Sequence, residues 1–368
     1  MFRGTQNRFS LTRVAVSTSG YTKGGLLSVA GHSCGLTSTT PVHQCQCRPS
    51  RLTTAGCAVA ITLAVLWITS TNAQNLFVSN LYSKSIWEFD LGGNLITASL
   101  GSGLGDPQGI AFDRSGNLYM AYYDYGVRRG SVAKLGPSGA LISASFISGL
   151  GYPTGLAFDS GGNLYVANTD YGRIAKYSPT GNLLNATFAT GLSSAWAMAF
   201  DKDDNLYVTD SSNNKVVKIG QSGSMNASFI TGLGYPTGLC FDRSGDLCVA
   251  NYYTGIISKY DTTGHLLNAS FAVTGQGYNV ESLAIDLGGN LYVGNNGNGV
   301  VMKFGPDGNL INASFASGGA GAEYIAFPLV VPEPSCWMVA GLGLSTVLVV
   351  KRRKRSNQDG VSEGKSSD

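Results

Sequence analysis

NLYVANTDYGRIAKYSPTGNLLNATF, residues 163–188, is the stretch that decides the fold, because the chain repeats it six times. A copy of the NLYV phrase, or a close variant, starts at each of Asn75, Asn117, Asn163, Asn205, Asp246 and Asn290. The starts are 42, 46, 42, 41 and 44 residues apart. A period in the low forties is typical of repeat architectures, in which one supersecondary unit packs on the next.

Each unit holds four short apolar runs, and none is long enough for a helix. In the third copy these runs are residues 164–167, 174–177, 183–188 and 195–200. They are rich in Val, Ile, Tyr and Phe and are bounded by turn-forming residues, which predicts β-strands. The recurring Asp-x-x-Gly-Asn before the NLYV runs predicts a tight turn, because glycine supplies a positive φ and the Asp side chain bonds to the turn backbone. Six such units predict an all-β fold, a six-bladed β-propeller with four antiparallel strands per blade.

The phase of the repeat predicts how the ring closes. The first copy begins at Asn75 without the strand that precedes every other copy, and the last copy ends with that strand, Tyr324–Phe327. We therefore expect Tyr324–Phe327 to pair with Leu76–Ser79 and to complete a ring of 24 strands, because closure protects strand edges. A linear β-solenoid is the alternative, but it gives no reason for the chain to stop at this phase.

The repeats resemble the NHL family in the phrase PTGLAFDSGGNLYVANTDYGRIAKYSPTGNLL, residues 153–184. The resemblance covers residues 75 to 329, and we take residues 74–329 as the propeller domain. NHL and related six-bladed propellers include non-enzymatic binding modules as well as lyases and lactonases. The resemblance therefore implies the fold and leaves the activity open.

The composition of the propeller argues against nucleic-acid binding. The chain holds 50 glycines in 368 residues, with 13% charged and 43% apolar residues, which suits an all-β chain with many turns. Residues 75–329 contain 13 Lys and Arg against 18 Asp and Glu, a net charge near −5. A nucleic-acid partner would require a basic face.

The N-terminal part predicts export. Residues 1–50 are polar and aperiodic, and we interpret them as an unstructured leader or a mis-assigned start. Residues 51–73 have the pattern of a signal peptide: a basic start, an apolar core at 55–68 and a small-residue end at Ala73. An N-terminal membrane anchor is the alternative, although the apolar run is short for one.

Aromatic residues gather on one predicted face of the ring. In propellers, the loop between the second and third strands of a blade and the loop that enters the next blade share a face. Tyr and Trp offer flat apolar area and a polar group, which suits a sugar or a peptide segment. The alternative is that these rings only pack the loops. Tyr125 is expected on this face as well. The predicted ligand-binding residues are Tyr122, Tyr123, Tyr152, Trp196, Tyr235, Tyr252, Tyr253 and Tyr278.

Catalytic residues are not predicted. The propeller has one histidine, His265, in a turn expected on the opposite face. The acidic candidates form no recurring set; they are Glu281, Glu323, Asp106, Asp170 and Asp210. We therefore expect no catalytic residue, no metal site and no cofactor. The alternative is a metal-dependent lyase or lactonase that uses carboxylates at the central channel.

Two cysteines flank one of the predicted turns. Cys240 and Cys248 would lie opposite each other across the turn at 242–246. Directly opposed Cβ atoms in an antiparallel pair come close to the distance of a disulfide. The hypothesis is a disulfide between Cys240 and Cys248; the alternative is two small residues that fill a repeat position.

The C-terminal part carries the most specific motif. Pro332-Glu333-Pro334 is followed by an apolar run at 336–350 and a basic cluster at 351–355. Residues 330–355 resemble the bacterial PEP-CTERM protein-sorting signal, with a polar tail at 356–368. The resemblance implies a transmembrane helix, recognition of Pro332–Pro334 by an exosortase-type enzyme and removal of the tail. A plain single-pass anchor is the alternative, and it also places the propeller outside the cytoplasm.

Together these patterns predict an exported bacterial protein at the cell envelope, the cell surface or in the extracellular matrix. The expected role is a binding or interaction module for a polysaccharide or protein, attached to the membrane by its C-terminal helix before processing. The other two candidates are the lyase or lactonase and a purely structural surface protein.

Overall fold

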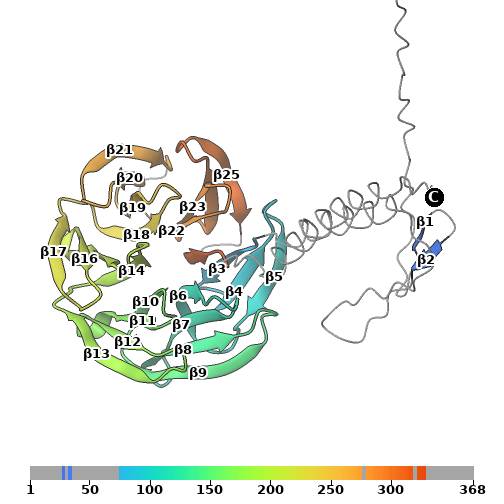
Figure 1. The fold of residues 1–368 in the computed structure, drawn as a ribbon, viewed down its shortest axis with the longest axis horizontal. Helices are drawn as coiled ribbons and strands as arrows, with labels where there is room; N and C mark the ends of the chain where they lie inside the picture. The colour runs from blue at the N-terminus through green and yellow to red at the C-terminus, as the bar shows by residue number, and fades with distance from the viewer. Residues whose placement is uncertain (1–26, 30–31, 35–73, 276–278, 318–320, 329–368) are drawn as a thin grey trace, which may run out of the picture. The chain divides into compact units, whose positions relative to one another are not determined.

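Six four-stranded antiparallel sheets form a closed ring, with the first strand of each blade nearest its centre (Figure 1). The structure, a computed structural model, describes residues 27–29, 32–34, 74–275, 279–317 and 321–328. The predicted signal peptide and sorting signal lie outside these residues. The described part of the chain contains no helix that is long and apolar enough to cross a membrane.

The strands follow the predicted order, and we number the blades by the copy that they contain. Blade 1 comprises β26 (Ala322–Ala326), β3 (Leu76–Asn80), β4 (Ser85–Phe89) and β5 (Leu95–Leu100). Blade 2 comprises β6 (Asp106–Phe112), β7 (Leu118–Asp124), β8 (Arg129–Leu135) and β9 (Leu141–Leu150). Blade 3 comprises β10 (Pro153–Phe158), β11 (Leu164–Asn168), β12 (Arg173–Tyr177) and β13 (Leu183–Thr190).

The second half repeats the pattern. Blade 4 comprises β14 (Ala195–Phe200), β15 (Leu206–Asp210), β16 (Lys215–Ile219) and β17 (Met225–Ile230). Blade 5 comprises β18 (Pro236–Phe241), β19 (Leu247–Asn251), β20 (Ile256–Tyr260) and β21 (Leu266–Val273). Blade 6 comprises β22 (Val280–Ile285), β23 (Leu291–Asn295), β24 (Val300–Phe304) and β25 (Leu310–Ser317). Single 3-10 turns, Thr169–Tyr171 and Ser211–Asn213, join the middle strands of blades 3 and 4.

The ring closes as the phase of the repeat predicts. Strand β26 pairs with β3 in blade 1, with Ile325 opposite Val78. The observed strand begins two residues earlier than predicted and ends one residue earlier, because Phe327 leaves the ladder and packs edge-on against Tyr292. In the N-terminal unit, β1 (Leu27–Val29) and β2 (His32–Cys34) pair with each other, in a segment for which the sequence predicts no regular structure.

A buried tyrosine anchors most blades. In blade 4, Tyr207 lies between Phe229 and Phe241, with ring centroids 5.2 and 4.9 Å away. Its hydroxyl donates to the Asp201 carboxylate at 3.1 Å, and the Lys218 ammonium lies 4.8 Å from the ring centroid. Asp201 also accepts from the Asn205 backbone at 2.9 Å, so the turn aspartate holds both the turn and the core. The equivalent buried tyrosines are Tyr119, Tyr165 and Tyr292.

The two blades without this tyrosine rearrange their charges. In blade 5, Cys248 replaces the tyrosine, and Lys259 binds Asp242 at 2.6 Å and Asp246 at 3.0 Å. In blade 1, Phe77 replaces the tyrosine, and Glu88 stands at the lysine position, where it accepts from the Asn75 amide at 2.6 Å. A lysine is present where an aspartate needs a counter-charge and absent where no aspartate precedes the strand.

The predicted cysteine pair lies where the sequence places it. Cys240 and Cys248 are direct partners in the β18–β19 ladder. Both residues are free thiols in the structure. The register of the hypothesis is therefore confirmed, and the disulfide itself stays a prediction.

Close approach of neighbouring inner strands requires glycine. A Cβ atom on Gly155 would overlap the carbonyl oxygen of Trp196 in the next blade, and one on Gly109 would overlap the Thr154 carbonyl. Neither glycine has a positive φ, so the requirement is space between blades rather than backbone conformation.

We expect Gly155→Ala to lower the free energy of unfolding by about 1–3 kcal/mol, because the inner strands of blades 3 and 4 must separate to admit the methyl group. Denaturant unfolding of both proteins measures the difference. Gly136→Ala is the matched control, since its Cβ would meet the nearest atom at 3.5 Å, an ordinary contact. Equal losses in the two variants would contradict the close-approach argument.

Candidate functional site

The first strands of the six blades surround the centre of the ring, which is called the channel below, and their side chains line the cavity there. In all six of these strands the ladder register shifts near the third residue. Such irregularities re-aim side chains and are common beside functional sites. Equivalent residues then form three layers. The polar layer comprises Gln108, Thr154, Trp196, Thr237, Glu281 and Glu323. The next layer consists mainly of small residues and comprises Gly109, Gly155, Ala197, Gly238, Ser282 and Tyr324. The aliphatic layer comprises Ile110, Leu156, Met198, Leu239, Leu283 and Ile325.

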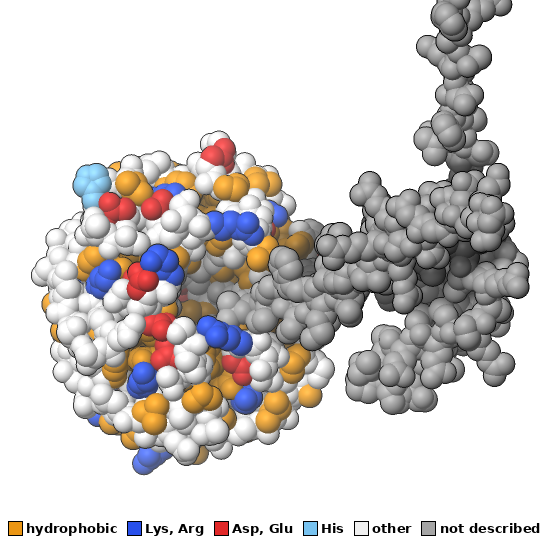
Figure 2. Space-filling view, in the orientation of Figure 1, with side chains coloured by type: hydrophobic (Ala, Val, Ile, Leu, Met, Phe, Trp, Pro, Cys, Tyr) orange, Lys and Arg blue, Asp and Glu red, His pale blue; other side chains and the backbone are white. Residues whose placement is uncertain are grey.

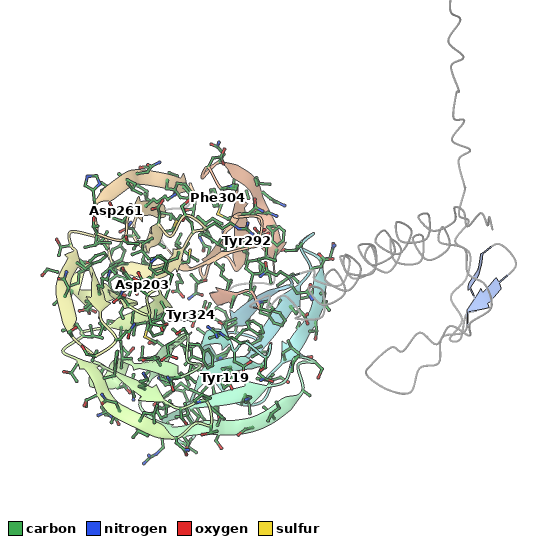
Figure 3. All side chains as sticks on the ribbon, viewed as in Figure 1. Tyr119, Asp203, Asp261, Tyr292, Phe304 and Tyr324 are labelled. Atoms are coloured by element: carbon green, nitrogen blue, oxygen red, sulfur yellow. The ribbon has the colours of Figure 1, made fainter. Side chains whose placement is uncertain are left out.

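Tyr324 fills the space that the small residues of its layer leave. The side chain lies near the middle of the ring (Figure 3), and its hydroxyl donates to the Trp196 carbonyl in the opposite blade at 3.2 Å. Its ring stacks on the Trp196 indole, with centroids 6.4 Å apart. The aliphatic layer and the small residues beside it line a cavity of about 70 Å³, and Tyr324 forms part of its wall.

Polar atoms without partners concentrate in the channel wall. Thr154 and Thr237 bond to the carbonyls of Ala195 and Val280 in the next blade, at 2.7 and 2.6 Å. The other residues of the polar layer are not satisfied in this way. Nine buried side-chain polar atoms of the described residues make no hydrogen bond, and six of them belong to Gln108, Trp196, Glu281, Ser282 and Glu323. Buried polar groups are normally paired, so such a cluster marks a place where water or a ligand binds.

Two glutamates form the centre of this cluster. The Asn296 amide donates to Glu281 Oε1 at 3.1 Å and to Glu323 Oε1 at 3.5 Å, which leaves Oε2 of each carboxyl without a partner among the described residues. Burial raises the pKa of Glu281 to about 7, against the opposing effect of Asn296. Burial, and then the charges of Glu281 and Asp106, raise the pKa of Glu323 to about 9. The Gln108 amide lies beside Glu323 and opposes part of this rise, although neither of its polar atoms forms a well-aligned hydrogen bond.

The tyrosines form two clusters. The first joins Tyr123 to Tyr125 and Tyr152, with ring centroids 4.8 and 5.1 Å apart. The second joins Tyr235, Tyr252 and Tyr253, with centroids 5.3 to 5.8 Å apart. These six residues are called the tyrosine clusters below.

Both tyrosine clusters adjoin the glutamate pair. Burial, and then the charge of Glu323, raise the pKa of Tyr152 in the first cluster. Burial, and then the charge of Glu281, raise the pKa of Tyr252 in the second cluster. The Tyr252 hydroxyl also donates to Asn279 at 2.5 Å, beside the start of β22. The clusters and the carboxyl pair therefore belong to one face of the ring.

Other predicted site residues have different roles. Tyr122 does not belong to the exposed face: it is 8% exposed, and its hydroxyl donates to the Ala144 carbonyl at 3.0 Å. Successive residues of a strand point to opposite sides, so Tyr122 enters the core while Tyr123 does not. Trp196 is half-buried in the channel wall, and Tyr278 lies outside the described residues.

The acidic candidates also have different roles in the structure. Asp210 is fully buried and accepts from the backbone of Ser193 and Ser194 at 2.9 and 3.1 Å, so it supports a loop. Glu281 and Glu323, in contrast, occupy one repeat position in adjacent blades, which sequence reasoning missed. The sequence does show this equivalence, because every copy has an apolar residue four positions after this one. That residue is Ile285 after Glu281 and Phe327 after Glu323.

The larger hollows lie on the opposite face. Those of about 500 and 520 Å³ are lined by the Asp-x-x-Gly-Asn turns of blades 2 to 5. Figure 2 shows this face, with acidic and basic side chains side by side around the opening. The turn aspartates Asp113, Asp159 and Asp201 already bind turn amides and core tyrosines. Size alone therefore does not make these hollows the functional site.

Comparison with known proteins supports the fold alone. No protein-family model matches the chain, and no curated protein matches its sequence. A chain of a nidogen/laminin complex is 19% identical, with a TM-score of 0.55 over 70% of this chain and 98% of that one. A streptogramin B lyase is 13% identical, with a TM-score of 0.52 over 68% and 83%. A gluconolactonase from Xanthomonas campestris is 17% identical, with a TM-score of 0.50 over 69% and 88%.

Removing the glutamate pair should stabilise the protein at alkaline pH. Each carboxyl has a higher pKa in the folded protein than the value of 4.5 expected for an unfolded chain. Its contribution to stability is therefore full below about pH 4.5 and is lost as the pH rises through about 7 and about 9.

We expect the Glu281→Gln/Glu323→Gln variant to gain stability over the parent protein between pH 5 and pH 9, by more than about 1.4 kcal/mol, the equivalent of one pKa unit. Thermal unfolding across this range measures the gain. Glu88→Gln, outside the channel, is the control for the loss of a carboxyl elsewhere in the propeller. A pH-independent difference for the double variant would contradict the shifted pKa values.

Proposed function

We propose that this chain is an exported binding module that takes a sugar or peptide segment at the tyrosine-bearing mouth of its channel. The observation that carries the proposal is the gathering of unpartnered buried polar atoms on the channel wall beside two tyrosine clusters. Tyrosine rings offer flat apolar contact area, and the free amide and carboxyl atoms offer directional hydrogen bonds. Binding sites commonly combine these two features.

Exposure of the rings supports the same proposal. Tyr125 and Tyr253 are 61% and 51% exposed, while their partners Tyr123 and Tyr252 are half-buried. Each cluster therefore presents one accessible ring that is held by its neighbours. A pre-packed ring loses little conformational entropy when it contacts a ligand.

A metal-dependent lyase or lactonase is the second candidate, and the glutamate pair is the observation that favours it. Two carboxyls with different raised pKa values can serve as a general acid and a general base. The described residues contain no group of three or more His, Cys, Asp and Glu side chains that could hold a metal ion. Solved structures of this fold include both a lyase and a nidogen/laminin complex, so the fold favours neither candidate.

The positions of the chain ends suit display of the tyrosine face. The Gln74 side-chain amide donates through Nε2 to the Pro328 carbonyl at 2.9 Å, and its Oε1 accepts from the Leu287 backbone N–H in a turn of blade 6. Both ends of the propeller therefore leave from the turn face, opposite the tyrosine clusters. We propose that the signal peptide at 51–73 directs export and that an exosortase-type enzyme acts at Pro332–Pro334 in the cell envelope of a bacterium.

Substitutions in the tyrosine clusters should weaken ligand binding. We expect Tyr125→Ala and Tyr253→Ala each to lower affinity for a bound oligosaccharide or peptide about tenfold, or about 1.4 kcal/mol, through loss of the accessible ring. Glycan and peptide arrays identify the ligand, and titration calorimetry measures the affinities. Tyr171→Ala is the matched control, an exposed tyrosine that stacks on Arg173 outside the clusters. An unchanged affinity in both cluster variants would refute the proposed face.

Processing at both ends can be measured directly. Mass spectrometry of the protein from its natural host should find an N-terminus at Gln74, after cleavage behind Ala73, and a C-terminus near Pro334. Replacing Pro332, Glu333 and Pro334 by alanine should retain the C-terminal tail and leave the N-terminus unchanged. A natural protein that ends at Asp368 would refute processing, and one that keeps residues 51–73 would refute the signal peptide.

A further inference from the structure

We propose that Glu281, Glu323 and Gln108 form a receptor for a primary ammonium group, such as that of an amino sugar or a lysine side chain. This inference rests on the proposed binding function and names the chemical group that the channel mouth recognises. Three side chains on three consecutive blades supply it, from β22, β26 and β6.

The free acceptors match an ammonium group in number. Glu281 Oε2, Glu323 Oε2 and Gln108 Oε1 are all buried and have no hydrogen-bond partner among the described residues. An alkylammonium carries three N–H donors and no acceptor. An ammonium group therefore has one donor for each of the three acceptors, whereas a hydroxyl has a single donor.

The site is buried. Gln108, Glu281 and Glu323 are 1%, 6% and 5% exposed, and their unpaired atoms lie beneath the surface, so a bound ammonium group would be desolvated there. The Asn296 amide holds Oε1 of both carboxyls and so fixes where their free oxygens lie. A preorganised pair of acceptors binds with a smaller entropy cost than two mobile side chains.

The pair lacks a cationic partner in the described part of the chain. Lys84 binds Asp106 at 2.9 Å instead, and the ion pairs of the described residues include neither Glu281 nor Glu323. Two neighbouring buried carboxyls cannot both ionise without an opposite charge. A bound cation supplies that charge and is therefore favoured over a neutral ligand.

Aromatic side chains complete the surroundings. Tyr324 is stacked on Trp196, and burial and then the charges of both glutamates raise its pKa. Burial and then the charge of Glu323 raise the pKa of Tyr152. Aromatic faces attract an ammonium group through their quadrupoles. The charged and titratable groups that face the pair are Asp106 with its partner Lys84, Tyr152, Tyr252 and Tyr324.

Binding of an ammonium group requires the carboxyls to lose their protons. The affinity should therefore rise with pH as long as the ligand itself stays charged. A neutral ligand that accepts hydrogen bonds from protonated carboxyls would show the opposite trend. The direction of the pH dependence thus separates the two kinds of ligand.

The first test titrates the full chain with n-butylammonium and with n-butanol, a neutral analogue of similar size. We expect n-butylammonium alone to bind, with at least tenfold higher affinity at about pH 8.5 than at about pH 6, since the alkylamine stays protonated at both values. Absence of n-butylammonium binding at both pH values, or equal binding of n-butanol, overturns the inference.

The second test uses single variants that keep the side-chain size. Glu281→Gln and Glu323→Gln should each weaken n-butylammonium binding at least tenfold at about pH 8.5, because the amide cannot supply a negative charge. Glu88→Gln, on β4 and outside the channel, should bind as the parent protein does. Thermal unfolding confirms that each variant is folded. Unchanged affinity in both channel variants overturns the inference.

The third test identifies the source of the ammonium group and separates this inference from the proposed function. The paired probes are glucosamine oligomers against N-acetylglucosamine oligomers, and lysine peptides against their acetyl-lysine forms. Preference for one amine-bearing probe names the source. Equal binding of amine and acetylated probes keeps the binding module and overturns the ammonium receptor. Stoichiometric binding of calcium or magnesium chloride that blocks n-butylammonium also overturns it and favours the enzyme.

Discussion

The bond from a buried tyrosine hydroxyl to a turn aspartate is the constraint on which the blades depend. A hydroxyl in the core needs an acceptor, and in blades 2, 3, 4 and 6 the first residue of the Asp-x-x-Gly-Asn turn provides it. The same carboxylate then requires a counter-charge, which the lysine of the next strand supplies at 3.3 to 3.9 Å. The turn, the core tyrosine and the lysine ion pair therefore all depend on one carboxylate and form one structural unit. Blades 1 and 5 lack the tyrosine, and their charges differ accordingly. In blade 1 Glu88 stands at the lysine position, and in blade 5 Lys259 also binds Asp246 in the turn.

Because this unit holds the middle strands, the inner strands are free to differ from blade to blade. The polar layer contains an amide, two threonines, an indole and two carboxyls at one repeat position. The threonines hold the next blade, as a structural repeat requires. The other four side chains leave buried polar atoms unpaired, at a cost that a purely structural channel would avoid. Divergence from the repeat at the channel wall is therefore what distinguishes the candidate site.

The two faces of the ring carry different groups of residues. The turn face carries the repeated aspartates and both ends of the propeller, and its polar groups are largely paired within the blades. The opposite face carries the tyrosine clusters and the glutamate pair. The proposed ligand site and the two ends of the propeller, Gln74 and Pro328, therefore lie on different faces.

The sequence by itself determined the number of blades, the strand order and the closure by β26, because period and phase are properties of a one-dimensional pattern. It also placed Cys240 opposite Cys248 and most of the tyrosines on loops of one face. It could not show that Tyr122 turns into the core, that Tyr324 crosses the channel to Trp196, or that Glu281, Glu323 and Gln108 converge. Those facts depend on contacts between blades. Only the folded ring brings such residues together, because residues as distant as Trp196 and Tyr324, 128 positions apart, become neighbours when six sheets meet at a common axis.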